Sequence, residues 1–436
     1  MDGFMRRLRQ LAAKFPKRSP GYWFGALVVL AVILWTEPFI DAKLNLADER
    51  NWAFEHFAQS VTNPALPRDV KLVLIGDDEY WDGDLHHRSP TDRSYIARLV
   101  QALDVANAQV IALDFDLRLP HPNDVATPGR YAVVDAYKPY RDETDLLVKA
   151  IDDVAQRRKI VLSRTISGKV DGPFDFESDA YQAYGLCTRL HADGQWDNPG
   201  TPEFPLTAEA RQNISCGYIA LMTDKRRVPP PARINGQSER LDAFPLAIVR
   251  AWDQSAVPRL ESGTYYASYI RQDVIRNPRI TMSAGSLLGD PAKARSILGG
   301  KPVIVGAAWS QRAKGRGGQV DLHDTPIGKV SGPVIYENVA EAVLSNRALR
   351  GLDEHALWWL ELLVGMAAAV IFAAFSDFRM RVVVVVAAIA LMFVAQWMIL
   401  QLFGTFFDAF VPVVGLGLHA IGTRLAGEPN EKAATA

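Results

Sequence analysis

The C-terminal part of the chain is its most constraining feature, because residues 356–424 carry very few charges. Three apolar stretches lie there, at 356–375, 382–403 and 406–423, and each approaches the roughly 20 residues that a helix needs to cross a bilayer. Tryptophan and phenylalanine stand near their ends, as is typical of residues at a membrane interface. We therefore expect three transmembrane helices, of which the last has the weakest pattern.

A fourth apolar stretch lies near the other end of the chain, at 21–40. Six basic residues precede it, and by the positive-inside rule they mark 1–20 as cytoplasmic. The sequence WTEPFIDAK lacks the small residues of a signal-peptide cleavage site, so we expect an uncleaved transmembrane helix. Four crossings place the tail at 424–436 in the cytoplasm and 41–350 outside. This pattern predicts a multi-pass protein of the inner (cytoplasmic) membrane with a large periplasmic or extracellular domain.

Between the apolar ends, the sequence has the pattern of an α/β domain with a mainly parallel sheet. DVKLVLIGDD is a short continuous apolar run, typical of a strand that is buried on both faces. A stretch with helical periodicity follows, with Ser89 and Thr91 as candidate caps, and then a second apolar run, QVIALDFDLRLP. Strand, helix and strand in this order predict a βαβ unit with parallel neighbours.

The same alternation continues further along the chain. A helical pattern in DETDLLVKAIDDVAQRR leads into KIVLSRT, and PAKARSIL leads into KPVIVGAAW. GPVIYENVAEAVLS then predicts another helix. Between about 166 and 300 the sequence is rich in turn residues, and we expect a loop-rich insertion of antiparallel strands there.

The chain has two cysteines, Cys187 and Cys216, and both fall in this predicted insertion. Outside the cytoplasm two cysteines in one subdomain favour a disulfide bond, which would contribute about 3 kcal/mol to stability. Two free thiols remain the alternative, although no neighbouring basic residue suggests that they are reactive.

Acidic residues gather where the predicted parallel strands end, which is where ligands bind in sheets of this kind. The candidate ligand-binding residues are Asp77, Asp78, Asp114, Asp116, Asp321, His323 and Asp324. The last three belong to DLHDTPIG, in the predicted loop after a late strand. The cluster could bind a cation or a cationic or polyhydroxylated ligand. It could equally hold loops together by accepting backbone N–H groups, and a hydrolytic metal site is a third alternative.

Several of these motifs resemble the type-two CHASE domain, an extracytoplasmic sensory module attached to cyclases, histidine kinases and other signalling outputs. KLVLIGDD resembles its opening strand and ANAQVIALDFDL its second strand, while ASYIRQDVIRNPRITMSAGSLLGD resembles the strand before its end. KPVIVGAAW followed by DLHDTPIGKVSGPVIYENVAEAVL resembles its closing signature. The resemblance extends over most of 65–350. One span before the domain and about three after it also resemble the layout of the family.

The resemblance implies a sensor without enzymatic activity. Only 13 residues follow 423, so we expect a separately encoded signalling effector, in the cytoplasm or the membrane, as partner. The lipid bilayer is the second partner, and association with further copies of the chain is left open. A structural subunit that docks another envelope protein and a periplasmic metal-dependent hydrolase are the alternatives. The near-equal numbers of basic and acidic residues, 48 and 49, give no reason to expect nucleic acid, and no cofactor is expected apart from a cation in the acidic cluster.

Overall fold

We describe the fold from a computed structural model of the chain, which divides into two compact units. One unit is Thr62–Leu349, and the other combines Met1–Val61 with Arg350–Ala436. The structure describes residues 54, 69–86, 91–115, 117, 137–166, 183–184, 206–219, 225–233, 240–256, 265–269, 276–311, 318–319, 321–345, 347–352, 359, 363, 366, 370, 378–403 and 405–406.

The unit Thr62–Leu349 is built around one mainly parallel sheet. Its strands are β1 (Lys71–Ile75), β2 (Val110–Asp114), β3 (Lys159–Ile166), β4 (Ala183–Tyr184), β5 (Ile214–Tyr218), β9 (Thr281–Ser283) and β10 (Pro302–Ala307). Six strands run parallel in the order β5-β3-β2-β10-β1-β9. β4 pairs antiparallel with the last residues of β3. The α/β class and the mainly parallel sheet that the sequence predicts are therefore confirmed.

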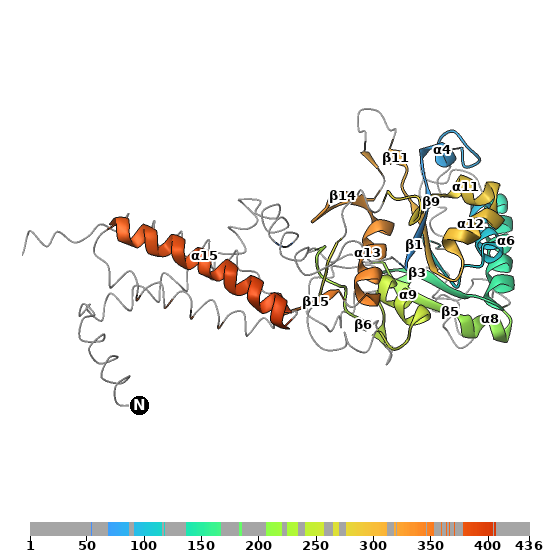
Figure 1. The fold of residues 1–436 in the computed structure, drawn as a ribbon. Coiled ribbons are helices and arrows are strands. Elements are labelled where there is room, and N and C mark those ends of the chain that lie inside the picture. Colours follow the sequence, from blue (N-terminus) through green and yellow to red (C-terminus); the bar gives the residue numbers. More distant parts are fainter. Residues whose placement is uncertain are drawn as a thin grey trace, which may run out of the picture. The chain divides into compact units, whose positions relative to one another are not determined.

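Helices cover both faces of the sheet (Figure 1). On one face lie α5 (Arg93–Val105), α6 (Tyr137–Ala155), α8 (Ala208–Asn213), α11 (Ala284–Gly289) and α12 (Pro291–Leu298). On the other face lie α9 (Phe244–Trp252) and α13 (Gly332–Leu344). Strand residues alternate between two buried clusters: Val73 packs toward the first group of helices, and Leu72 packs toward the second. Apolar side chains on both faces are what a continuously apolar strand requires.

The order of the central strands differs from the sequence-based expectation. β1 and β2 are parallel, but β10 lies between them, with Val303 opposite both Lys71 and Ile111. The βαβ unit thus connects strands that are not neighbours. β10 is buried over five of its six residues, and such a strand gains most from a central position. The order of strands so distant in sequence is a long-range property that local periodicity does not reveal.

The region 166–300 also differs from the predicted antiparallel insertion. β5 and β9 join the main sheet in parallel, and FPLAIVRAW forms α9, with a proline in its first turn. β6 (Ala232–Arg233) and β7 (Arg240–Leu241) do pair antiparallel. Arg227 makes an antiparallel bridge to Tyr266 in β8 (Tyr265–Ala267). The helix before β5 has only six residues, which is too short for its period to be recognised in the sequence.

Two short hairpins follow β10. β11 (Ser310–Gln311) pairs with β12 (Gly318–Gln319), and β13 (Leu322–Thr325) pairs with β14 (Gly328–Ser331). DLHDTPIG is therefore mostly a hairpin and not the loop that we expected. Its turn ends at Gly328, where φ is +97°, a value that favours glycine.

The second unit contains one long described helix, α15 (Phe378–Phe403), and a short strand β16 (Thr405–Phe406). Arg350 and Gly351, at the end of β15 (Ala348–Gly351), pair with Thr405 and Phe406. Over the described residues, no helix meets the combined length and hydropathy of a bilayer crossing.

The predicted spans are thus not confirmed. The stretch 382–403 is helical, as part of α15, while 21–40 and most of 356–375 and 406–423 lie outside the described residues. The predicted segments 1–20 and 424–436 also lie outside them.

Candidate functional site

The strand ends that were expected to carry the site do lie side by side. Asp114 is the last residue of β2 and is opposite Gly306 near the end of β10, and Gly306 is opposite Leu74 near the end of β1. Asp77 follows β1 in a short helix, α4 (Asp77–Tyr80). The carboxyl ends of three adjacent parallel strands therefore bring parts of the predicted acidic cluster to one edge of the sheet.

Asp77 joins the segments that follow β1 and β10. Its Oδ1 accepts the backbone amide of Ser310 at 2.6 Å, and both of its carboxylate oxygens accept the Ser310 hydroxyl, at 2.9 and 2.8 Å. The indole Nε1–H of Trp81 donates to the Ser310 carbonyl at 2.8 Å. Tyr80 stacks on Trp309, with ring centroids 4.1 Å apart and planes at 2°. Through these contacts the carboxylate of Asp77 holds two loops together, which is one of the interpretations that the sequence left open for the acidic cluster.

The next carboxylate, on Glu79, was not identified from the sequence. Glu79 is buried, and its Oε2 accepts the Gly76 amide while its Oε1 accepts the Gly285 amide, both at 2.8 Å. It thereby connects the end of β1 with the beginning of α11. Asp78, which was a candidate, is exposed between these two tightly held residues. The sequence does show three successive acidic residues after the strand. Only their contacts in the structure reveal that Asp78 points into solvent and that Glu79 is buried.

Asp114 and Asp321 approach each other at the beginning of α13. A Cβ on Gly332, the first residue of α13, would lie 2.2 Å from Asp321 Oδ2 and 3.8 Å from Asp114 Oδ2. The Gly332 amide donates to the Asp321 carbonyl at 3.2 Å. Asp321 has φ +57°, in the left-handed region that aspartate tolerates better than most residues. Two carboxylates that are 207 residues apart in sequence are thus directed at the same helix end.

Glycine at 306 makes this close approach feasible. A Cβ on Gly306 would lie only 2.3 Å from Cγ of Pro333, in the first turn of α13, and 3.4 Å from Asp114 Oδ2. The helix can therefore begin directly over β10, next to the end of β2. The sequence does contain this signal, in a glycine near the end of one apolar run and a Gly-Pro pair at the start of the next helix.

The electrostatic environment of Asp114 is unusual for a carboxyl group. Burial, and second the negative charge of Asp321, raise the pKa of Asp114 to about 8. Both causes disfavour ionisation. The pKa of Tyr336, on the second turn of α13, is also raised, by burial and then by Asp114 and Asp321. The Tyr336 hydroxyl donates to the Ile219 carbonyl at 2.6 Å. Asp114 therefore releases its proton less readily than an ordinary aspartate.

The two other candidates of DLHDTPIG lie on opposite faces of the β13–β14 hairpin, as successive strand residues must. His323 Nε2 is 2.7 Å from Asp321 Oδ1, so this histidine belongs with the acidic pair. Asp324 is 76% exposed and lies 3.8 Å from the ammonium of Lys329, which is similarly exposed. The structure thus brings Asp114, Asp321 and His323 together and leaves Asp324 facing solvent.

Two further candidates fall partly or wholly outside the described residues. Asp116 lies outside them, so its predicted role is not tested. Cys216, in β5, is disulfide-bonded, while Cys187 lies outside the described residues, so the pairing of these two cysteines stays a prediction. Within the described ranges, no group of three or more His, Cys, Asp or Glu side chains is arranged to hold a metal ion.

A family model described as the CHASE2 domain matches residues 26–375. No curated protein and no solved structure matches the chain.

Proposed function

Because the chain belongs to the CHASE2 domain family, whose members are extracytoplasmic sensory domains, we propose that this protein is a membrane-anchored sensor. Its large domain, outside the cytoplasm, detects a stimulus in the periplasm or at the cell surface. Its transmembrane helices relay the signal to a separately encoded signalling partner. The protein carries out no catalysis of its own.

The approach of Asp114 and Asp321 at the first residue of α13 is the observation that carries this proposal. Two carboxylates beside the first residue of α13, with His323 next to one of them, make an arrangement whose energy depends on protons and cations. The site lies at the carboxyl ends of parallel strands, where sheets of this type bind ligands. A ligand that neutralises the pair would change the contacts of α13. A ligand that binds one arrangement of α13 more tightly than another shifts the equilibrium toward that arrangement.

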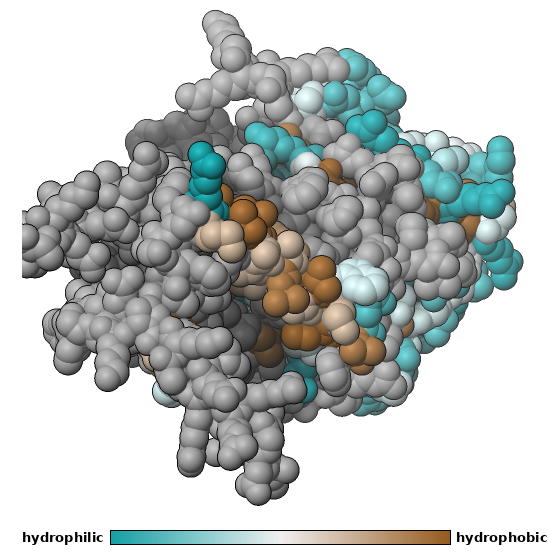
Figure 2. Space-filling model, turned by 60° about the vertical axis from the view of Figure 1, so that its left-hand side comes forward, coloured by the Kyte–Doolittle hydropathy of each residue, from teal (hydrophilic) through white to brown (hydrophobic). Residues whose placement is uncertain are grey.

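The exposed apolar side chains of α15 support the membrane anchor. Val383, Leu391 and Leu402 are 59%, 67% and 68% exposed. Figure 2 shows a band of such hydrophobic side chains on the face turned forward. Large apolar side chains exposed along a whole helix are unfavourable in water and favourable in lipid. We propose that 21–40, 356–375, 382–403 and 406–423 cross the inner membrane.

The relay to a partner can be tested by recovery of that partner. The full-length protein, tagged at its N-terminus, is cross-linked mildly in its native membrane, purified and analysed by mass spectrometry. We expect a cytoplasmic cyclase, kinase or protease that is enriched over an equally abundant, unrelated multi-pass protein carrying the same tag. Recovery of envelope proteins alone would instead favour the role of a structural subunit.

The ligand site can be tested on the purified full-length protein. Thermal unfolding is followed with Ca²⁺, Mg²⁺ or the cationic polyamine spermidine as probes of the cation class. We expect at least one probe to raise the melting temperature of the wild type and not that of the D114N/D321N double variant. D324N is the matched control, since it removes an exposed carboxylate of the same hairpin and should retain the response. Equal responses in all three proteins would contradict the assignment of the site.

A further inference from the structure

Helix α13 is buried along almost its whole length, and this includes its charged residues. Every residue from Gly332 to Val343 is buried, with Glu337 and Glu341 0% and 1% exposed. An ionised carboxylate in such a position is costly unless it makes good hydrogen bonds. The partners of Glu341 are therefore informative about what α13 does in the fold.

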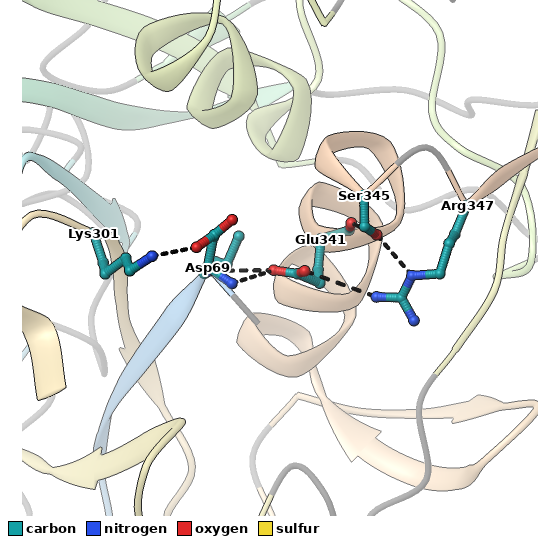
Figure 3. Close-up of polar contacts among 6 residues, drawn as sticks. Asp69, Lys301, Glu341, Ser345 and Arg347 are labelled. Carbon is teal, nitrogen blue, oxygen red and sulfur yellow. Dashed lines mark hydrogen bonds and ion pairs between the residues drawn. The ribbon is translucent and has the colours of Figure 1, made fainter. Parts of the chain in front are cut away.

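Glu341 binds the segment with which the chain enters the sheet. Its Oε2 accepts the backbone amides of Asp69, at 2.9 Å, and Val70, at 3.0 Å (Figure 3). These residues directly precede β1. The side chain of Asp69 also forms an ion pair with Lys301, directly before β10. The carboxylate of Glu341 thus fixes the first residues of the sheet to the last turns of α13.

The same carboxylate also contacts the segment that leaves the domain. Oε1 of Glu341 lies 3.8 Å from a terminal guanidinium nitrogen of Arg347, whose side chain is only 7% exposed. Arg347 Nε–H donates to the Ser345 hydroxyl at 2.7 Å, and that hydroxyl donates to the Glu341 carbonyl (Figure 3). The compact unit ends at Leu349, two residues further on. One buried side chain therefore connects the first described residues of this unit with Arg347, close to its end.

The other end of α13 is the proposed stimulus site. Gly332 lies against Asp321 and Asp114, and it is nine residues before Glu341. With a rise of 1.5 Å per residue, the two positions are separated by about 14 Å along the helix. A regular helix that is enclosed on all sides moves as a rigid body, since its packing does not deform continuously. A displacement at Gly332 is therefore expected to reach Glu341.

We propose that α13 is the transmitting element of this protein and that Glu341 is its coupling residue. Glu341 converts a movement of α13, started at the Asp114–Asp321 pair, into a change in the segments that connect the domain with 21–40 and 356–375. This inference rests on the proposed sensory function and adds a route for the signal. The coupling is a property of the chain itself, so it can be measured without a signalling partner.

The test is hydrogen–deuterium exchange of the full-length protein in detergent micelles, read at peptides that contain residues 69–71. The perturbation is G332A, because the added Cβ would meet Asp321 Oδ2 and displace that carboxylate. We expect G332A to change the exchange rate at 69–71 by about threefold or more, a factor within the range that energetic coupling between distant sites produces. G289A is the matched control, since a Cβ there meets nothing within 4 Å. It should leave exchange at 69–71 unchanged.

The variant E341Q identifies the residue that couples the two ends. Loss of the charged acceptor should by itself raise exchange at 69–71 about tenfold. G332A should then have no further effect in the E341Q background. If G332A changes exchange only near 321–336, or acts equally with and without Glu341, the proposal is wrong.

Should E341Q not fold, the comparison of G332A with G289A decides alone. Recovery of a signalling partner is independent of these results, so failure of the coupling and failure of the sensory function can be told apart.

Discussion

Asp77 and Ser310 are joined by three hydrogen bonds although 233 residues separate them in sequence. One of these bonds runs from a backbone amide to a carboxylate, a type that contributes about 1.5–3 kcal/mol. D77A should therefore lower the stability of the domain by about 2 kcal/mol, or roughly 4–8 °C in melting temperature. Thermal unfolding of the purified full-length protein measures this shift.

The neighbouring residue provides the control for this prediction. Asp78 is exposed, and the substitution of an exposed residue away from special features changes stability by about 0.5 kcal/mol at most. D78A should therefore unfold close to the wild-type temperature. Similar losses in D77A and D78A would mean that the bonds to Ser310 contribute little.

The raised pKa of Asp114 predicts a dependence of stability on pH. The ordinary value is 3.8 and the folded-state value is about 8, so between these pH values the folded protein keeps a proton that the unfolded chain has released. Stability should then fall as the pH rises through this window, by up to about 1.4 kcal/mol per unit. D114N removes the ionisable group, so it should unfold at a higher temperature than wild type at pH 8.5 and at a similar temperature at pH 4.

A second variant separates the two causes of this shift. Burial is the larger cause and the charge of Asp321 the smaller one, so D321N should give a gain at pH 8.5 that is smaller than that of D114N. Melting temperatures measured from pH 4 to 9 on wild type and both variants provide the comparison. A D114N protein whose difference from wild type is the same at every pH would contradict the shift.

The close approach of α13 to β10 predicts a large effect of one added methyl group. A Cβ on Gly306 would lie 2.3 Å from Pro333 Cγ, and neither the central strand nor the proline ring can move away easily. G306A should cost about 3 kcal/mol, as overpacking of a dense core does. G289A meets nothing and should be neutral or slightly stabilising. Chemical or thermal unfolding of both variants checks this, and equal stabilities would exclude the strain.

The sequence predicted the local elements of the domain better than their arrangement. Continuous apolar runs identified β1, β2, β3 and β10, because a strand buried on both faces leaves that pattern. The position of β10 between β1 and β2 was not predictable, since it depends on packing among strands that are far apart in the chain. The parallel course of β5 was missed for a related reason, as the short helix before it has too few residues to show a period.

The candidate site was predicted only in part, because the direction and the partners of each side chain also depend on packing between distant segments. The rule that ligands gather at carboxyl ends of parallel strands brought Asp114 and Asp321 into one candidate set, and the structure places them at the same helix end. The rule does not say which way a side chain points, so it also selected Asp324, which faces solvent. Glu79 and Glu341 were missed because each accepts a backbone amide from a segment more than 200 residues away.

The disulfide bond of Cys216 predicts a measurable contribution to stability. Cys216 lies in β5, and Cys187 is the expected partner, which would close a loop of about 30 residues. In the chain-entropy model such a loop contributes about 3–4 kcal/mol. C216S and C187S should therefore unfold at a clearly lower temperature than wild type, and to the same extent as each other.

Reduction provides the matched measurement. A reductant should lower the melting temperature of the wild type to that of the variants and should leave the variants unchanged, since they have no bond to lose. Peptide mapping without reduction should recover the two cysteine peptides as one linked species. Alkylation of either cysteine in the native, unreduced protein would contradict the pairing, because a bonded sulfur does not react.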